Sequence, residues 1–159
     1  MWVPETVDLP ATREAAEAWE SLFRAQVALM RRFQRDDVWA PLTIREYDVL
    51  FTLSGCPGGA ARLRDLGEVS LLTQPSLSRL VERLEKDGLV TRGPVAGDAR
   101  GVLVTLTPEG AQVQREIGRR HVRSIRHLVG GALDAEELAT LRALTDKLRA
   151  AQAGIPDPG

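Results

Sequence analysis

The sequence predicts a mainly α-helical protein with one small β-hairpin. Most of the chain repeats apolar residues at intervals of three and four, the period of a helix that packs along one side. One region, residues 89–107, is rich in Val and Thr, as strands are. A length of 159 residues, 43% hydrophobic and 27% charged, suits a single domain over residues 1–159 and is too short for a two-domain enzyme.

The first helix is expected over residues 12–35, beginning after a Leu-Pro pair. Its apolar residues follow one another at spacings of four, four and three and form one stripe: Trp19, Phe23, Val27 and Met30. A stripe of this kind requires a partner surface that removes it from water.

The second helix is expected to begin after Thr43. Thr43 and Glu46 have the capping-box spacing, in which each side chain bonds the backbone N–H of the other residue, and Leu42 can pack on Tyr47 as a hydrophobic staple. Because the following CPGG sequence cannot continue a helix, we expect an end near Ser54–Gly55.

A short helix fits residues 64–70, followed by a tight turn and a helix from the cap Thr73 to Gly88. One side of this second helix is an apolar stripe suited to a core: Leu77, Leu80, Val81 and Leu84. The opposite side consists of Pro75, Ser78, Arg79 and Glu82. A solvated face more often carries long Lys and Glu side chains than Pro and Ser, so we expect another molecule to approach this side closely.

Two strands are expected next, residues 89–95 and 102–107, separated by the hairpin tip AGDARG. The tip places Asp98 and Arg100 between two glycines. Residues 108–150 are then expected to form two amphipathic helices, the first capped by Thr107 and the second by Asp134 with Glu137 three residues on.

A short helix, a tight turn, a second helix and a hairpin follow one another in a winged helix-turn-helix, here over residues 42–107. This fold places its second helix in the major groove of DNA. The residues expected to contact DNA are Thr73, Gln74, Pro75, Ser76, Ser78, Arg79 and Arg100. Short side chains let the helix start approach bases and phosphates, and Arg100 suits a narrow minor groove.

Asp98 is expected to support the wing by orienting Arg100 rather than by binding DNA. Two plainer interpretations stay open. The Ser and Thr residues also serve as ordinary helix caps, and the hairpin tip also fits an exposed ion pair worth less than about 1 kcal/mol.

The chain resembles the multiple-antibiotic-resistance regulator (MarR) family of winged-helix transcription factors. The resemblance rests on LLTQPSLSRLVERLEKDGLVTR (71–92) followed by GDARGVLVTLTPEG (97–110), which match a recognition helix, an Asp-x-Arg wing and the Leu-Thr-x-x-Gly start of a long helix. It implies a homodimer, held by the flanking helices at 12–35 and 108–150, that grips a pseudo-palindromic operator. Ala99 stands where relatives often have a basic residue, so we expect weaker phosphate binding by this wing.

The flanking helices support a dimer independently, because their apolar stripes exceed what a small neighbouring domain would bury. Packing within one chain is the alternative. MarR-type proteins often release DNA when a small aromatic or anionic effector binds between the dimer helices and the winged helix. By analogy such a pocket would be lined by Trp19, Phe23, Tyr47 and Phe51, although plain core packing also explains these residues.

Other chemistry lacks a starting point in the sequence. Phosphate-binding glycine loops, GxSxG and HExxH are missing, so we expect no enzyme, cofactor or metal site. His121 and His127 lie out of phase on one helix, and a core or interface role suits them better than metal binding. The single Cys56 excludes an intramolecular disulfide, and neither a signal peptide nor a membrane span is visible, so we expect a cytoplasmic protein.

The sequence thus predicts a DNA-binding transcriptional regulator, a ligand-responsive repressor that acts as a homodimer on double-stranded DNA. Five arginines and one glutamate in residues 115–126 give a local basic surface on a chain of net charge -1, but some of these arginines are expected to be interface or solvated residues. The alternative is a winged-helix module that binds another protein through the same helix. Steep salt dependence would distinguish DNA binding from it.

Overall fold

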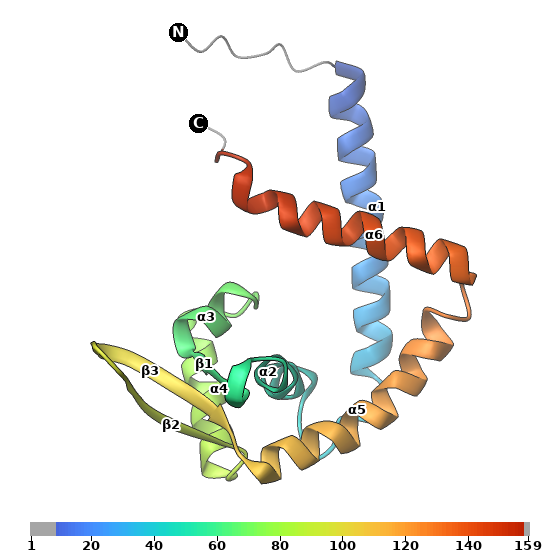
Figure 1. Ribbon diagram of the computed structural model, residues 1–159. Helices are drawn as coiled ribbons and strands as arrows, with labels where there is room; N and C mark the ends of the chain where they lie inside the picture. Colours follow the sequence, from blue (N-terminus) through green and yellow to red (C-terminus); the bar gives the residue numbers. More distant parts are fainter. Residues whose placement is uncertain (1–8, 158–159) are drawn as a thin grey trace, which may run out of the picture. The chain divides into compact units, whose positions relative to one another are not determined.

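The computed structural model describes residues 9–157, with side-chain environments from residue 12 onward. The chain divides into two compact units, Met1–Asp37 and Val38–Gly159. The first unit carries helix α1 (Leu9–Gln34), and the remaining described elements belong to the second (Figure 1). In chain order these are α2 (Ile44–Ser54), a 3-10 turn (Pro57–Gly59), β1 (Ala60–Arg62), α3 (Leu63–Glu68), α4 (Gln74–Lys86), β2 (Val90–Val95), β3 (Asp98–Leu106), α5 (Pro108–Leu128), α6 (Ala135–Ala151) and a 3-10 turn (Gln152–Gly154).

Helix α1 begins at Leu9, so the predicted start at Thr12 is wrong by about one turn. Pro10 lies in the first turn of the helix, where the missing N–H has no intrahelical partner to lose. The aromatic residues Trp19 and Phe23 are neighbours on this helix, with ring centroids 5.9 Å apart, and both are exposed.

The predicted helix starts in the second unit are confirmed. Glu46 N donates to Thr43 Oγ1 at 3.2 Å, and Thr43 N donates to Glu46 Oε2 at 2.9 Å, which completes the capping box of α2. Asp134 and Glu137 form the same reciprocal pair at the start of α6. Local side-chain spacing was sufficient to predict these starts because a capping box satisfies the backbone N–H groups within one turn.

The predicted hairpin is formed by β2 and β3, and a third strand, β1, pairs with β3 to give an antiparallel sheet in the order β1–β3–β2. Strand β1 was not predicted, because three residues of sequence AAR show no alternation of apolar and polar side chains. The hairpin tip is also shorter than predicted: β3 begins at Asp98, which lies opposite Val95, so that only Ala96 and Gly97 connect the strands. Gly97 has φ +76°, a conformation that favours glycine.

The core of the second unit forms around the predicted apolar stripe of α4. Leu77, Val81 and Leu84 are fully buried and Leu80 is 3% exposed. The other fully buried aliphatic residues of the second unit are Leu50 and Leu53 of α2, Val90 of β2, Val104 of β3 and Ile117 of α5. Burial of a whole leucine or valine side chain contributes about 1.5–3 kcal/mol, so this stripe determines which side of α4 remains exposed.

The start of α5 is joined to the end of α4 through backbone contacts. Thr107 Oγ1 donates to Gly88 O at 2.7 Å, and Thr107 N donates to Leu89 O at 3.1 Å. Gly110 is buried beside this carbonyl, and a Cβ atom there would overlap Leu89 O. The Leu-Thr-x-x-Gly motif therefore sets how closely α5 approaches the turn that follows α4.

Replacing Gly110 with Ala is expected to destabilise the protein by about 1–3 kcal/mol, because the new methyl group meets backbone that cannot rotate away. Chemical denaturation followed by circular dichroism measures this change. Gly55→Ala is the matched control, since a Cβ there only meets Thr52 O at 3.6 Å. Equal stability of the two variants would contradict the close approach at Gly110.

Candidate nucleic-acid interface

The start of α4 presents hydroxyl groups and an uncovered helix terminus. Thr73 caps the helix, with Ser76 N donating to Thr73 Oγ1 at 3.4 Å and Thr73 Oγ1 donating to Ser76 Oγ at 2.9 Å. Thr73 and Pro75 are exposed, and the first turn contains no acidic residue. The partial positive charge of the helix start therefore faces solvent, where it attracts anions.

Gln74 differs from the other predicted contact residues. Its side chain lies against Gly67 of α3, where an added Cβ would overlap the Gln74 amide nitrogen. Part of the Gln74 side chain therefore packs in the turn between α3 and α4. The sequence contained no sign of this contact, because it depends on two helices meeting at a glycine.

Arg79 and Arg100 are exposed cations at the two ends of the predicted contact surface. Ser78 precedes Arg79 on α4 and is half-buried. Within the described residues, neither the Arg79 nor the Arg100 guanidinium takes part in a salt bridge. Both charges are thus available to an anionic partner.

Asp98 supports the wing through the backbone of Arg100. Arg100 N donates to Asp98 Oδ1 at 3.1 Å, and the other carboxylate oxygen lies 3.6 Å from Arg62 Nη1. A Cβ at Gly101 would come within 2.8 Å of the same carboxylate and of Val95. The carboxylate of Asp98 thus holds the backbone of Arg100 through its amide N–H. Arg62 of β1 is a further residue of this site, and it was not predicted because its strand was not predicted.

A salt bridge between Glu85 and Arg92, also missed, ties the wing to the recognition helix. Arg92 N donates to Glu85 Oε2 at 2.7 Å, and Arg92 Nε and Nη2 donate to Oε1 at 3.2 and 3.0 Å. The hydrogen bonds from the Arg92 side chain and then from its backbone lower the pKa of Glu85. A second bond to α4 comes from α2, where Glu46 accepts from Arg83 Nε at 3.4 Å.

A cavity of about 540 Å³ lies between α2 and α5. Tyr47 and Phe51 contribute from α2, their rings stacked at 6.0 Å, and Arg115 and Arg119 contribute from α5. Asp48 also lines the cavity, and desolvation raises the pKa of its carboxyl group. Two of the four residues predicted for an effector pocket thus meet here, and the other two, Trp19 and Phe23, lie on α1 in the first unit.

His121 is a packed residue, as the sequence analysis favoured. Its ring centroid lies 4.5 Å from Trp39 and 5.8 Å from Tyr47, whereas His127 is exposed. The Cys56 thiol is half-buried and donates to Thr52 O at 3.3 Å. In the part of the chain that the structure describes, no group of three or more His, Cys, Asp and Glu residues could hold a metal ion, and no helix is long and apolar enough to cross a bilayer.

Comparison with known proteins identifies relatives of this arrangement. A model of the MarR family matches residues 40–101, from just before α2 to the beginning of β3. The transcriptional regulator FarR of Neisseria gonorrhoeae is 32% identical over 110 residues, which are 69% of this chain and 74% of that protein. FarR carries the name of a transcriptional regulator rather than of an enzyme.

Two solved structures share the fold over nearly the whole chain. Sco3205 of Streptomyces coelicolor, a MarR family transcriptional regulator in complex with DNA, is 30% identical with a TM-score of 0.71, covering 91% of this chain and 93% of that one. BpsR of Bordetella bronchiseptica, whose DNA binding is regulated by 6-hydroxynicotinic acid, is 27% identical with a TM-score of 0.70, covering 84% of this chain and 98% of that one.

The salt bridge between Glu85 and Arg92 makes stability depend on pH. Because folding lowers the pKa of Glu85, its contribution is fully present above the ordinary glutamate value of 4.5 and is lost as the pH falls through the folded value. Glu85→Gln should therefore be less stable than the native protein at neutral pH, and the difference should shrink in acid. Urea unfolding at a series of pH values measures it.

Arg92→Ala tests the same salt bridge from the other side, because it removes the side-chain hydrogen bonds that lower the Glu85 pKa. Arg92→Ala should therefore lose most of the pH-dependent stability that Glu85→Gln loses. A stability gap between the native protein and Glu85→Gln that stays constant from neutral to acid pH would contradict the assigned role.

Proposed function

This chain belongs to the MarR family of DNA-binding transcriptional regulators, and we propose that it represses transcription as a homodimer on a pseudo-palindromic operator until a small effector releases it. The observation that carries the proposal is the exposed side of α4, with its polar start and the unpaired charge of Arg79 opposite a buried stripe. A protein that reads chromosomal DNA in bacteria works in the cytoplasm, which is the location we propose.

In the proposed complex the start of α4 enters the major groove. Ser76 and Ser78 then offer hydrogen bonds to base edges or phosphates, and Arg79 can form a bidentate contact with guanine. Thr73, Gln74 and Pro75 form the closely approaching helix start. Arg100 at the wing reaches the neighbouring minor groove, where a guanidinium meets negative potential. A relative bound to DNA makes this partner more fitting than another protein.

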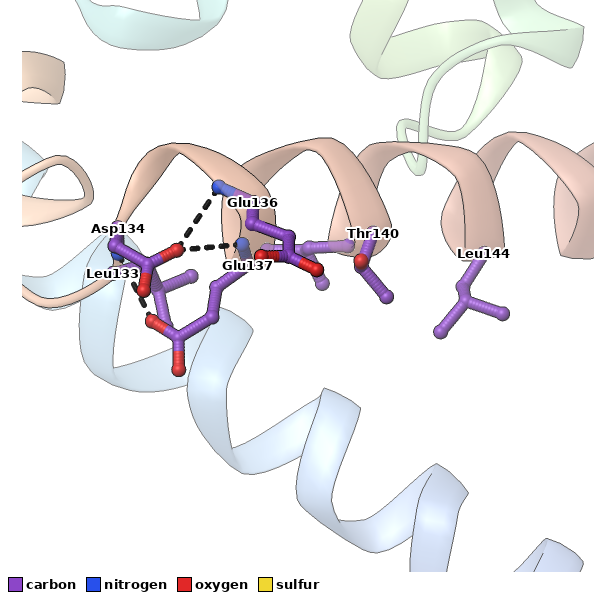
Figure 2. A pocket seen from close by; sticks show the side chains of 7 residues that line it. Leu133, Asp134, Glu136, Glu137, Thr140 and Leu144 are labelled. Atoms are coloured by element: carbon purple, nitrogen blue, oxygen red, sulfur yellow. Dashed lines mark hydrogen bonds between the residues drawn. The ribbon is translucent and has the colours of Figure 1, made fainter.

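The apolar surface outside the winged helix supports a dimer. No residue of α6 is buried, and Leu141, Leu144 and Leu148 are 42%, 60% and 51% exposed. Leu144 and the capping residues of α6 line a hollow of about 440 Å³. Figure 2 shows their side chains along the helix. A second copy would cover such surface, and the two α4 helices would then be about 34 Å apart, one turn of B-DNA.

The cavity between α2 and α5 fits an aromatic anion. Tyr47 and Phe51 offer ring faces, and Arg115 and Arg119 offer positive charge on the other wall. Regulation of DNA binding of the relative BpsR by 6-hydroxynicotinic acid supports this ligand class for this chain. Trp19 and Phe23 remain predicted contributors from α1. The ligand must favour a dimer in which the two α4 helices are spaced differently, because only differential affinity shifts an equilibrium.

Arg79→Ala is expected to lower the affinity for an operator duplex, selected from random sequences by the native protein, by about 1–3 kcal/mol. The affinity for random-sequence duplexes should fall less, because those duplexes lack the matching guanine. Fluorescence anisotropy measures both affinities. Arg149→Ala, an exposed arginine on α6, is the matched control. Equal losses on both duplexes would make Arg79 a phosphate contact and contradict a base-reading role.

Arg100→Ala is expected to weaken operator binding and to lower the slope of log affinity against log salt by about 1, the effect of one lost ionic contact. The dimer should be unchanged by sedimentation velocity, because Arg100 lies on β3 and not on α1, α5 or α6, the helices proposed to form the dimer. Arg100→Lys should restore part of the affinity, since it keeps the charge. An unaltered dissociation constant for Arg100→Ala would remove the wing from the DNA contact.

A panel of phenolic acids is expected to contain compounds that lower operator affinity. Replacing Arg115 and Arg119 together with Ala should abolish this response while leaving the affinity without ligand within about twofold, an effect on the order of 0.4 kcal/mol. Arg126→Ala, on the same helix but outside the cavity lining, is the control. No change across the panel, or an unchanged response in the double variant, would contradict the assignment of this cavity.

A further inference from the structure

The turn between α3 and α4 carries a leucine that the fold does not use. Leu71 is 99% exposed, and its neighbour Val69 is 70% exposed. Most other exposed large apolar residues of the described chain lie on α1, α5 and α6, where a second copy would cover them. Leu71 lies instead two residues before Thr73, at the start of the recognition helix.

This turn is held in shape by its own polar contacts. Leu72 N donates to Ser70 Oγ at 3.3 Å, Ser70 N donates to Gly67 O at 3.4 Å, and the Gln74 side chain lies against Gly67. Leu72 is half-buried, so the turn directs Leu72 toward the protein and Leu71 into solvent. Leu71 is therefore presented to a partner without any rearrangement of the backbone.

The partner proposed for this side of the molecule is DNA, because Leu71 lies two residues before Thr73, the cap of the helix start that is proposed to enter the major groove. In the major groove the base edges present hydrogen-bonding groups and one large apolar group, the 5-methyl group of thymine. We propose that Leu71 packs against the 5-methyl group of a thymine in each operator half-site and thereby determines specificity at that base pair. The inference rests on the proposed operator binding and adds a residue to it.

The proposed contact explains why a leucine is kept in water at this position. Moving an aliphatic side chain and a methyl group out of water together is favourable by about 25 cal/mol per Å² of apolar area. A cytosine at the same position lacks the methyl group and presents an amino group, which leucine cannot bond. Leu71 would thus favour thymine in a way that the Ser and Arg side chains of α4 do not.

Deoxyuridine substitution tests the contact, because uracil differs from thymine only in lacking the methyl group. The probe is an operator duplex selected from random sequences by the full chain, with each thymine replaced in turn in both half-sites. For the native protein we expect one position at which the substitution weakens binding about threefold to tenfold, consistent with the loss of buried methyl groups. Leu71→Ala should bind the thymine duplex as weakly as the native protein binds that deoxyuridine duplex.

The decisive result is that Leu71→Ala no longer distinguishes thymine from deoxyuridine at that position. Ile155→Ala, which truncates an exposed aliphatic residue near the C-terminus, should keep the native discrimination between thymine and deoxyuridine. Leu71→Ala should also keep the native melting temperature, because the side chain is almost fully exposed.

Three outcomes would overturn the inference. Native discrimination retained by Leu71→Ala would place the methyl contact elsewhere, and equal weakening of Leu71→Ala on operator and random duplexes would indicate a sugar contact. Undiminished operator binding by Leu71→Ala would indicate that Leu71 contacts a protein partner and not DNA. If the native chain selects no duplex at all, the proposed operator binding fails first, which is a different result from these three.

Discussion

Burial of one side of α4 is the constraint on which the rest of the structure depends. Leu77, Leu80, Val81 and Leu84 are at most 3% exposed, and on a helix such a stripe fixes rotation about the axis. Pro75 and Arg79 then have to face outward. The exposure of the surface proposed to contact DNA is therefore a consequence of core packing.

Several polar contacts hold the neighbouring elements to this helix. The Glu85–Arg92 pair joins β2 to α4, Thr107 joins the start of α5 to the turn after α4, and Glu46 receives Arg83 from α4 (Figure 1). A displacement of α2 would thus act on α4, and a displacement of α5 on the turn after α4, through these hydrogen bonds. This connection gives the cavity between α2 and α5 a physical route by which a bound ligand could alter DNA affinity.

Local patterns predicted most of this organisation. The caps Thr43, Thr73 and Asp134 and the stripe of α4 depend on residues within one or two turns, so spacing alone was sufficient to identify them. Strand β1 and its Arg62, the Glu85–Arg92 salt bridge and the folding of Gln74 onto Gly67 were missed. Each of these depends on which segments meet in three dimensions, and no periodicity in the sequence encodes that.

The most direct test of the account is a map of backbone amide chemical shifts while the full chain is titrated with its selected operator duplex. The account predicts the largest changes at residues 71–79 and 98–101, the exposed side of α4 with the preceding turn and the wing. Changes confined to α6, or an absence of changes at both residues 71–79 and residues 98–101, would contradict it.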